Sequence, residues 1–227
     1  GSQGNDKIGD YRYVDTYRLA SSNGEMSVAF LEKGNPNITW ETNTNFNAGI
    51  EFGVLQNRIS GSIEYFNRKT TDMLMAFPTA PSLGYSSYYA NVGDMSNKGI
   101  EVDLNFTPIR SKNVQWDINV NLTHLKNKII SLPPERRTKE VEGYYGYAGS
   151  SFFYGQGLPL YTFHMKKYAG VSEDGRSMWY KDVKDKDGKP TGERTTTTAH
   201  SEASDYLCGN AIPDLYGGFG TSVSFFG

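Results

Sequence analysis

The sequence predicts an all-β protein, an antiparallel up-and-down transmembrane β-barrel segment with long extracellular loops. Apolar and polar residues alternate strictly along several unusually long segments, and short connections alternate with long ones between those segments. The composition agrees, because the 227 residues include 25 Gly, 16 Tyr and 12 Phe. Aromatic residues and glycine suit strands and turns better than helices.

The first alternating segment, about residues 38–54, has the period of two that marks a β-strand with two chemically different faces. Ordinary strands contain about 5–6 residues, whereas a strand that crosses a bilayer needs ~9–11. The odd positions carry Glu, Asn and Gly. The even positions, which are apolar or small, are Trp40, Thr42, Thr44, Phe46, Ala48, Ile50, Phe52 and Val54.

The following strands repeat this pattern. They are predicted over residues 58–69, 98–108 and 114–125, and from Tyr216 onward. Residues 1–37 hold many turn formers and are expected to be loop, with a short strand near Tyr11–Tyr17.

The connections between the strands alternate in length. Those at 55–58 and 108–113 are short, and those at 70–97 and 127–213 are long. Outer-membrane barrels have short periplasmic turns and long extracellular loops, so this rhythm favours an up-and-down sheet that crosses a membrane. Within the last connection, "MWYKDVKDKDGKPTGERTT" predicts a hairpin with Asp187–Gly188 at or near its tip.

Charged residues are absent from the apolar face of each strand across its central stretch. An Arg or Lys on a lipid-exposed face near the bilayer midplane costs roughly 2–4 kcal/mol, which accounts for their absence. The opposite face is then expected to line the lumen. The residues predicted to face the lumen are Glu41, Asn43, Asn45, Glu51, Glu101, Asp103, Asp117 and Asn119.

Aromatic residues cluster in the predicted loops, where rings can stack on sugars or pack on peptide side chains. The same rings could instead pack the loops onto the barrel rim or onto a partner subunit, and the sequence leaves both roles open. The predicted ligand contacts are Tyr85, Tyr88, Tyr89, Tyr144, Tyr145, Tyr147, Phe152, Phe153 and Tyr154.

Several other classes of function find no support. A net charge of −2 gives no electrostatic reason to bind nucleic acid. No apolar run reaches the ~18 residues of a transmembrane helix, and the chain does not open with a signal peptide. The single cysteine, Cys208, cannot form an internal disulfide. The three histidines are far apart and lack neighbouring ligands, and no nucleophile–base grouping occurs, so we expect no metal, no cofactor and no catalytic residues.

One alternative fold stays open on pattern alone. A soluble β-sandwich also alternates apolar and polar residues, with the apolar face buried against a second sheet. With its aromatic loops, such a sandwich would serve as a carbohydrate-binding module. The length of the strands and the rhythm of the connections favour the membrane barrel.

Particular motifs carry a resemblance to a known family. "GNPNITWETNTNFNAGIEFGVLQNRISGSIEYFNRKTTDML" (Gly34 to Leu74) closely resembles the barrel of the SusC/RagA family, the TonB-linked outer-membrane transporters of Bacteroidetes. The resemblance continues in family order through "NVGDMSNKGIEVDLNF", "GQGLPLYTFHMKKYAG" and "GNAIPDLYGGFGTSVSF", and so covers nearly the whole chain.

The resemblance implies active import of oligosaccharides or peptides across the outer membrane, powered through TonB, with a SusD-like lipoprotein as a lid. Family members are several times longer, with an N-terminal plug, a TonB-contact segment and a barrel of twenty-two strands. Residues 1–227 therefore resemble a partial barrel domain from which the plug, the TonB-contact segment and the closing strands are absent. A barrel that serves only as a surface anchor or adhesin is a further alternative.

Overall fold

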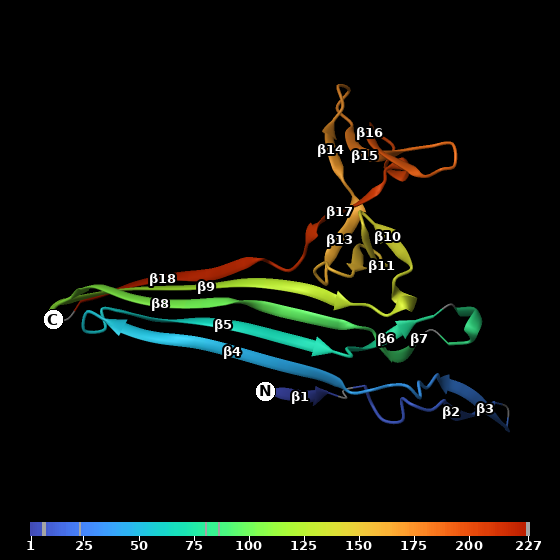
Figure 1. The fold of residues 1–227 in the computed structure, drawn as a ribbon, viewed down its shortest axis with the longest axis horizontal. Helices are drawn as coiled ribbons and strands as arrows, with labels where there is room; N and C mark the ends of the chain where they lie inside the picture. The colour runs from blue at the N-terminus through green and yellow to red at the C-terminus, as the bar shows by residue number, and fades with distance from the viewer. Residues whose placement is uncertain (6–7, 23, 80, 86, 226–227) are drawn as a thin grey trace. The chain divides into compact units, whose positions relative to one another are not determined.

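The computed structural model describes residues 1–5, 8–22, 24–79, 81–85 and 87–225. The chain divides into two compact units: a sheet unit, Gly1–Pro133 with Asp214–Gly227, and a loop unit, Pro134–Pro213. Both units are built from antiparallel β-strands, so the predicted all-β class is confirmed (Figure 1). Among the described residues, no helix is long and apolar enough to span a membrane.

The sheet unit contains a six-stranded antiparallel sheet in the order β1-β4-β5-β8-β9-β18 (Figure 1). Its strands are β1 (Ser2–Asn5), β4 (Glu41–Val54), β5 (Ile59–Thr71), β8 (Asp94–Arg110), β9 (Val114–Ser131) and β18 (Leu215–Phe225). The predicted long strands are confirmed, because the four central ones contain 14, 13, 17 and 18 residues. Strands β8 and β9 each extend several residues further toward the long connections than the alternation alone predicted.

The N-terminal region differs from the prediction of a loop with one short strand near Tyr11–Tyr17. Residues 11–14 lie in turns, with Tyr11 in the left-handed region at φ 60°. The strands are instead β1, which pairs with β4, and the hairpin of β2 (Thr16–Ser22) and β3 (Glu25–Glu32). The Asp15 carboxylate fixes the start of this hairpin, because it accepts hydrogen bonds from Lys33 Nζ at 2.9 Å and from the Gly34 N–H at 2.8 Å.

The register of the sheet unites the apolar positions of neighbouring strands on one face. Ile50 is opposite Ile63, which is opposite Val102, which is opposite Leu122. The resulting apolar face comprises Phe46, Ala48, Ile50, Phe52 and Val54 of β4; Ile59, Ile63 and Tyr65 of β5; Ile100, Val102, Leu104 and Phe106 of β8; Val114, Trp116, Ile118, Val120 and Leu122 of β9; and Leu215, Phe219, Val223 and Phe225 of β18.

This apolar face is exposed. Phe46, Ile50 and Phe219 expose 57%, 64% and 72% of their surface. A β-sandwich would bury these side chains against a second sheet. The exposed face therefore argues against the soluble sandwich and fits a sheet whose apolar side meets something other than this chain.

The two ends of the sheet differ. At the turn end, the predicted tight turn at 55–58 is confirmed, with Leu55, Gln56 and Asn57 all left-handed at φ 53°, 59° and 57°. Residues 111–113 make the second short turn, where the Ser111 N–H donates to the Val114 carbonyl at 2.9 Å. The opposite end carries the long connections and is called the loop end.

The 70–97 connection, predicted to be irregular, contains a hairpin at the loop end. Strand β6 (Leu74–Pro78) pairs with β7 (Ser87–Asn91), and a single turn of 3₁₀ helix, η1 (Pro81–Leu83), lies between them. Strand β8 then begins at Asp94, so the connection is shorter than the sequence predicted.

The loop unit is a folded body within the long connection predicted over residues 127–213. One sheet contains β10 (Lys139–Val141), β11 (Tyr144–Ala148), β12 (Phe152–Gly155), β13 (Thr162–Lys166) and β17 (Asp205–Asn210), and a second contains β14 (Tyr168–Val171), β15 (Ser177–Lys184) and β16 (Pro190–Thr197). The 3₁₀ turns are η2 (Pro134–Arg136) and η3 (His200–Glu202). Val141, Phe153 and Leu158 form the buried core, with Leu207 packed against them.

The hairpin predicted around Asp187–Gly188 is confirmed. Strands β15 and β16 pair from Trp179↔Thr197 to Lys184↔Pro190. Gly188 is left-handed at φ 78°, a conformation that glycine adopts without steric cost. The Asp185 carboxylate accepts hydrogen bonds from the N–H groups of Asp187 and Lys189, which closes the turn.

One glycine of the sheet allows close contact between neighbouring strands. A Cβ at Gly99 would lie 2.0 Å from the His124 carbonyl oxygen and 2.8 Å from Cζ of Phe66. Phe66 is directly opposite Gly99 on β5 and is only 5% exposed, so its ring covers the glycine. Any side chain at Gly99 would displace both the ring and the neighbouring backbone.

We expect Gly99→Ala to destabilise the intact protein by about 1–3 kcal/mol, because it overpacks this contact. The matched control is Gly220→Ala, since a Cβ there would meet only Asn119 Nδ2 at 3.9 Å. The control should be neutral or slightly stabilising. Urea unfolding of the protein reconstituted in lipid vesicles measures the difference, and equal midpoints for the two variants would contradict the prediction.

Candidate functional site

The residues predicted to face the lumen all lie on the face of the sheet opposite the apolar face, called here the polar face. Across the strands, Glu51 is opposite Ser62, which is opposite Asp103. Asn105 and Asn119 are direct partners, as are Asn45 and Arg68. The register thus brings together side chains from strands far apart in the sequence.

Hydrogen bonds hold both ends of the polar face. Near the loop end, Glu41 Oε1 accepts from Asn5 Nδ2 and Asn43 Nδ2, both at 3.1 Å. Toward the turn end, the Asp117 carboxylate accepts from Thr107 Oγ1 and Gln115 Nε2, both at 2.8 Å. These bonds link neighbouring strands or adjacent positions, and they hold the carboxylates of Glu41 and Asp117 in fixed orientations.

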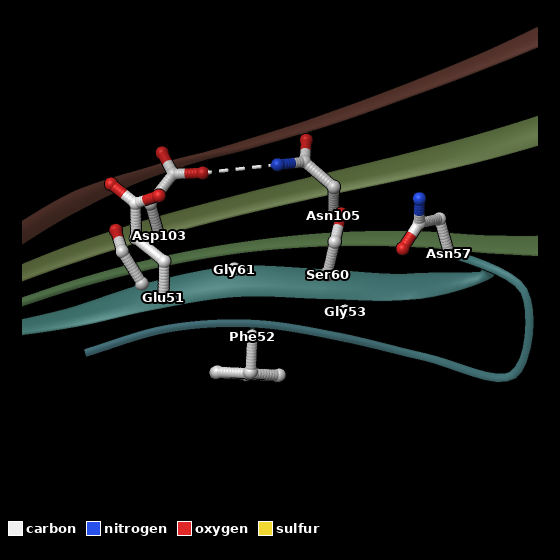
Figure 2. A pocket seen from close by; sticks show the side chains of 9 residues that line it. Glu51, Phe52, Gly53, Asn57, Ser60, Gly61, Asp103 and Asn105 are labelled. Carbon is white, nitrogen blue, oxygen red and sulfur yellow. Dashed lines mark hydrogen bonds between the residues drawn. The ribbon is translucent and has the colours of Figure 1, made fainter.

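A shallow hollow of about 550 Å³ lies on the sheet near the turn end. Figure 2 shows Glu51, Asp103 and Asn105 on one side of the sheet, with Asn105 donating to Asp103, and Phe52 pointing to the other side. The Asn105 Nδ2–Asp103 Oδ1 distance is 3.2 Å. Carboxylates accept hydrogen bonds and amides both accept and donate them, so this hollow can bind a polar group.

Glu64 is absent from the lumen-facing residues predicted from the sequence. Glu64 of β5 is directly opposite Glu101 of β8, on the polar face. Only the register makes this pairing evident, although the alternation along 58–69 already placed Glu64 opposite the apolar side. Glu51 and Asp103 lie in the next row of the same face, two positions along their strands from the row of Glu64 and Glu101. The middle of the polar face is therefore distinctly acidic.

The first group of predicted loop aromatics forms part of a ring cluster at the loop end of the sheet unit. The Tyr85 ring lies 6.0 Å from Phe30 and 6.4 Å from Tyr88, and Tyr88 lies 5.3 Å from Phe77. Tyr89 contacts Arg12, whose guanidinium carbon lies 4.7 Å from the ring centroid. These rings therefore join the β2–β3 and β6–β7 hairpins. Phe30 and Phe77 belong to the cluster but were not predicted from the sequence.

The second group lies in the loop unit, where strand parity divides it. Tyr145, Tyr147, Phe152 and Tyr154 share one face with Phe163, called here the aromatic face. Tyr147 and Tyr154 stack at 4.9 Å, and Phe152 and Phe163 stack at 5.1 Å. Two stacked ring pairs on adjacent strands make a platform of the kind that sugar rings or apolar side chains can cover.

Tyr144 and Phe153 belong to the other face of this sheet. Phe153 is fully buried in the core of the loop unit, so its predicted role as a ligand contact is corrected. The sequence could not separate it from Phe152 and Tyr154, because three consecutive aromatic residues look alike until the facing of the strand is known.

A polar hollow of about 580 Å³ lies within the loop unit and includes residues from β10, β15, β16 and β17. The Tyr206 hydroxyl donates to Asp182 Oδ1 at 2.5 Å, and the Arg194 guanidinium lies 4.5 Å from the Tyr206 ring centroid. Burial, together with the bond to Asp182, raises the pKa of Tyr206 to about 12. Burial and the nearby Lys139 lower the pKa of His164, which lines the same hollow.

This hollow is not evident from the sequence, because its residues are scattered over about seventy positions and carry no spaced motif. Within the described part of the chain, no three His, Cys, Asp or Glu side chains are grouped closely enough to hold a metal ion. The polar side chains that line the hollow, among them Asp182, Arg194 and Tyr206, can offer hydrogen bonds and charge to a ligand.

Several known proteins resemble this chain in sequence or in fold. A family model described as "TonB dependent receptor-like, beta-barrel" matches residues 11–198. The TonB-dependent receptor SusC of Bacteroides thetaiotaomicron is 32% identical over 187 residues, which cover 82% of this chain and 17% of SusC. TonB-dependent receptor P26 of Formosa agariphila is 26% identical over 99% of this chain and 23% of its own length.

Solved structures agree. The RagAB peptide transporter matches with a TM-score of 0.81 and 27% identity, over 99% of this chain and 24% of the RagAB chain. The "closed-closed" state of the RagAB peptide importer matches with a TM-score of 0.80 at the same identity and coverage. The chain thus spans between about a sixth and a quarter of the length of these relatives.

We expect Tyr206 to titrate near pH 12 in the folded protein. Its pKa is raised on folding, so its contribution to stability is complete below the ordinary tyrosine pKa of about 10 and is lost as the pH rises toward 12. Difference absorbance of phenolate in the intact protein and in Tyr206→Phe measures this titration. A difference spectrum that titrates near pH 10 would contradict the prediction.

Proposed function

Because this chain belongs to the family of TonB-dependent-receptor-like β-barrels, we propose that it forms part of the wall and rim of an active importer. The protein is an integral protein of the bacterial outer membrane, as its SusC and RagAB relatives are. In this proposal the exposed apolar face meets lipid and the polar face lines the lumen. The segregation of charge supports it, since every Asp and Glu of the four central strands below the loop end lies on the polar face.

We propose that further sequence of the same protein supplies the remaining strands, a plug and a TonB-contact segment. The order of the sheet supports this, because β1 and β18 are its outermost strands. An open sheet edge in lipid leaves backbone N–H and C=O groups unpaired, which costs several kcal/mol for each group. The relatives, about four times longer than this chain, have room for these parts.

The proposed cargo is an oligosaccharide or a peptide, received at the loop end. The RagAB relatives are described as a peptide transporter and a peptide importer. The aromatic face offers stacked rings for sugars or apolar side chains, and the hollow around Tyr206 offers hydrogen bonds and charges. We further propose that a SusD-like lipoprotein binds over the loops and delivers the cargo.

The family is one of receptors and transporters and not of enzymes. A surface anchor or adhesin remains the second candidate function, because an exposed apolar face and aromatic loops would serve either role. The two differ in energy supply: import needs TonB, whereas adhesion does not.

The experiment is growth of the native bacterium on single oligosaccharides or peptides, with and without this gene and with and without TonB. If the protein is an importer, deletion of either gene should abolish growth on the same substrate. If the tonB deletion leaves growth unchanged and only attachment of cells depends on this gene, the adhesin reading is correct.

A variant tests the aromatic face within this scheme. We expect Tyr147→Ala with Tyr154→Ala to lower uptake of a labelled substrate about threefold to tenfold, because one stacked ring pair is lost. The control is Tyr168→Ala, since Tyr168 lies on β14 in the other sheet of the loop unit and is 56% exposed. Equal uptake by both variants would remove the aromatic face from the proposal.

A further inference from the structure

Four lysines lie together on the apolar side of the sheet, at its loop end. They are Lys69 of β5, Lys98 of β8, and Lys126 and Lys128 of β9, and all four are exposed. We call them the lysine cluster. They share the parity of the apolar face, because each stands an even number of positions from an apolar-face residue of its own strand, such as Tyr65, Ile100 or Leu122.

The register makes the cluster compact. Lys98 is directly opposite Lys126, and Lys69 is opposite Ser96, which is opposite Lys128. Directly opposite residues on one face have Cβ atoms about 4.5–5.5 Å apart, and diagonal neighbours about 7–8 Å. Asn67, which is opposite Lys98, and Ser96 add an amide and a hydroxyl between the ammonium groups.

The cluster has no counter-charge on its own face. From the Thr44–Lys69–Ser96–Lys128 row to the turn end, that face carries no Asp or Glu on β4, β5, β8, β9 or β18. Within the described residues, these four lysines make no ion pair and no side-chain hydrogen bond. Like charges directly opposite one another are destabilising, so the Lys98–Lys126 pair carries an electrostatic cost that a bound anion would remove.

The position of the cluster indicates what that anion is. The row below Lys98 and Lys126 contains Tyr65, Ile100 and His124, and the rows after it continue the apolar face. Lysine side chains extend their ammonium groups toward water at such a boundary. The cluster therefore lies where the hydrocarbon band ends and lipid head groups begin, on the side that carries the long loops.

We propose that the lysine cluster binds the phosphate-bearing head group of an anionic lipid in the outer leaflet. The acyl chains of that lipid would lie along the apolar face beneath it, over Ile100, Val102 and Leu122. Basic clusters at a bilayer surface attract anionic lipids, and ammonium groups bind phosphate as point charges. A lipid fits better than a protein partner, because the cluster is continuous with the apolar face that, in the proposed function on which this inference rests, meets hydrocarbon.

The test uses the full-length protein in nanodiscs of phosphatidylcholine with roughly 20% phosphatidylglycerol, because basic clusters are attracted to anionic lipid by its charge. The triple variant Lys98→Gln, Lys126→Gln, Lys128→Gln is compared with wild type. Native mass spectrometry measures the retained phosphatidylglycerol relative to phosphatidylcholine. We expect the preference for phosphatidylglycerol to fall at least about tenfold in the variant.

The matched control is Lys167→Gln, Lys186→Gln, Lys189→Gln, which removes the same charge from the loop unit and should keep the preference. The charge-preserving triple Lys98→Arg, Lys126→Arg, Lys128→Arg should keep it as well. If the Gln triple does not fold, competition on wild type decides: salt should abolish retention of the lipid, whereas inorganic phosphate at the same ionic strength should do no more than salt.

Three results would overturn the proposal. They are an unchanged preference in the Gln triple, an equal loss in the loop-unit control, and displacement of the lipid by inorganic phosphate well beyond the effect of salt. The last would indicate a site for the free anion. Retention of lipid is measured without transport, so failure of the importer assignment would leave this result unaffected.

Discussion

The structure depends on one constraint, the antiparallel register that places the apolar residues of five neighbouring strands on the same face of the sheet. A shift of one residue in any pair would move every apolar side chain of that strand to the polar face. The continuous pairing from Val54↔Ile59 to Thr42↔Thr71, and its extension through β8 and β9, keeps Phe46, Ile50 and their partners together. Hydrocarbon on one side and a polar interior on the other would both enforce that register.

The alternation in the sequence was sufficient to predict this part of the fold. Apolar or small residues at every second position of 38–54 indicated both the strand and the direction of its faces, although β4 begins only at Glu41. The short turn at 55–58 was equally predictable, from the break in the pattern. The ends of the strands were less predictable. Strand β9 continues to Ser131, but Lys126 and Lys128 stand at positions of the apolar face, so the alternation of apolar and polar residues is lost there.

The loop unit could not be predicted in the same way. Its strands are only 3–8 residues long, and its core rests on a few residues, among them Val141, Phe153 and Leu158. Short strands in a small body show no sustained period. The Tyr206–Asp182 hydrogen bond joins residues that are 24 positions apart in the sequence and lie on different sheets. Nothing in the sequence indicates that these two residues are partners. The aromatic residues were recognisable as a group, but their division between platform and core required the pairing of β11 with β12.

The way in which the loop unit is attached has a consequence for how such a protein diversifies. Strands β9 and β18 are hydrogen-bonded neighbours, and the Leu125 N–H donates to the Asp214 carbonyl at 2.9 Å where β18 approaches. The whole of Pro134–Pro213 therefore occupies the place of a hairpin turn. Recombination or drift could exchange this module while every membrane-crossing strand keeps its partner. If the protein imports a substrate as proposed, selection on that substrate would then act separately from selection on how the protein sits in its bilayer.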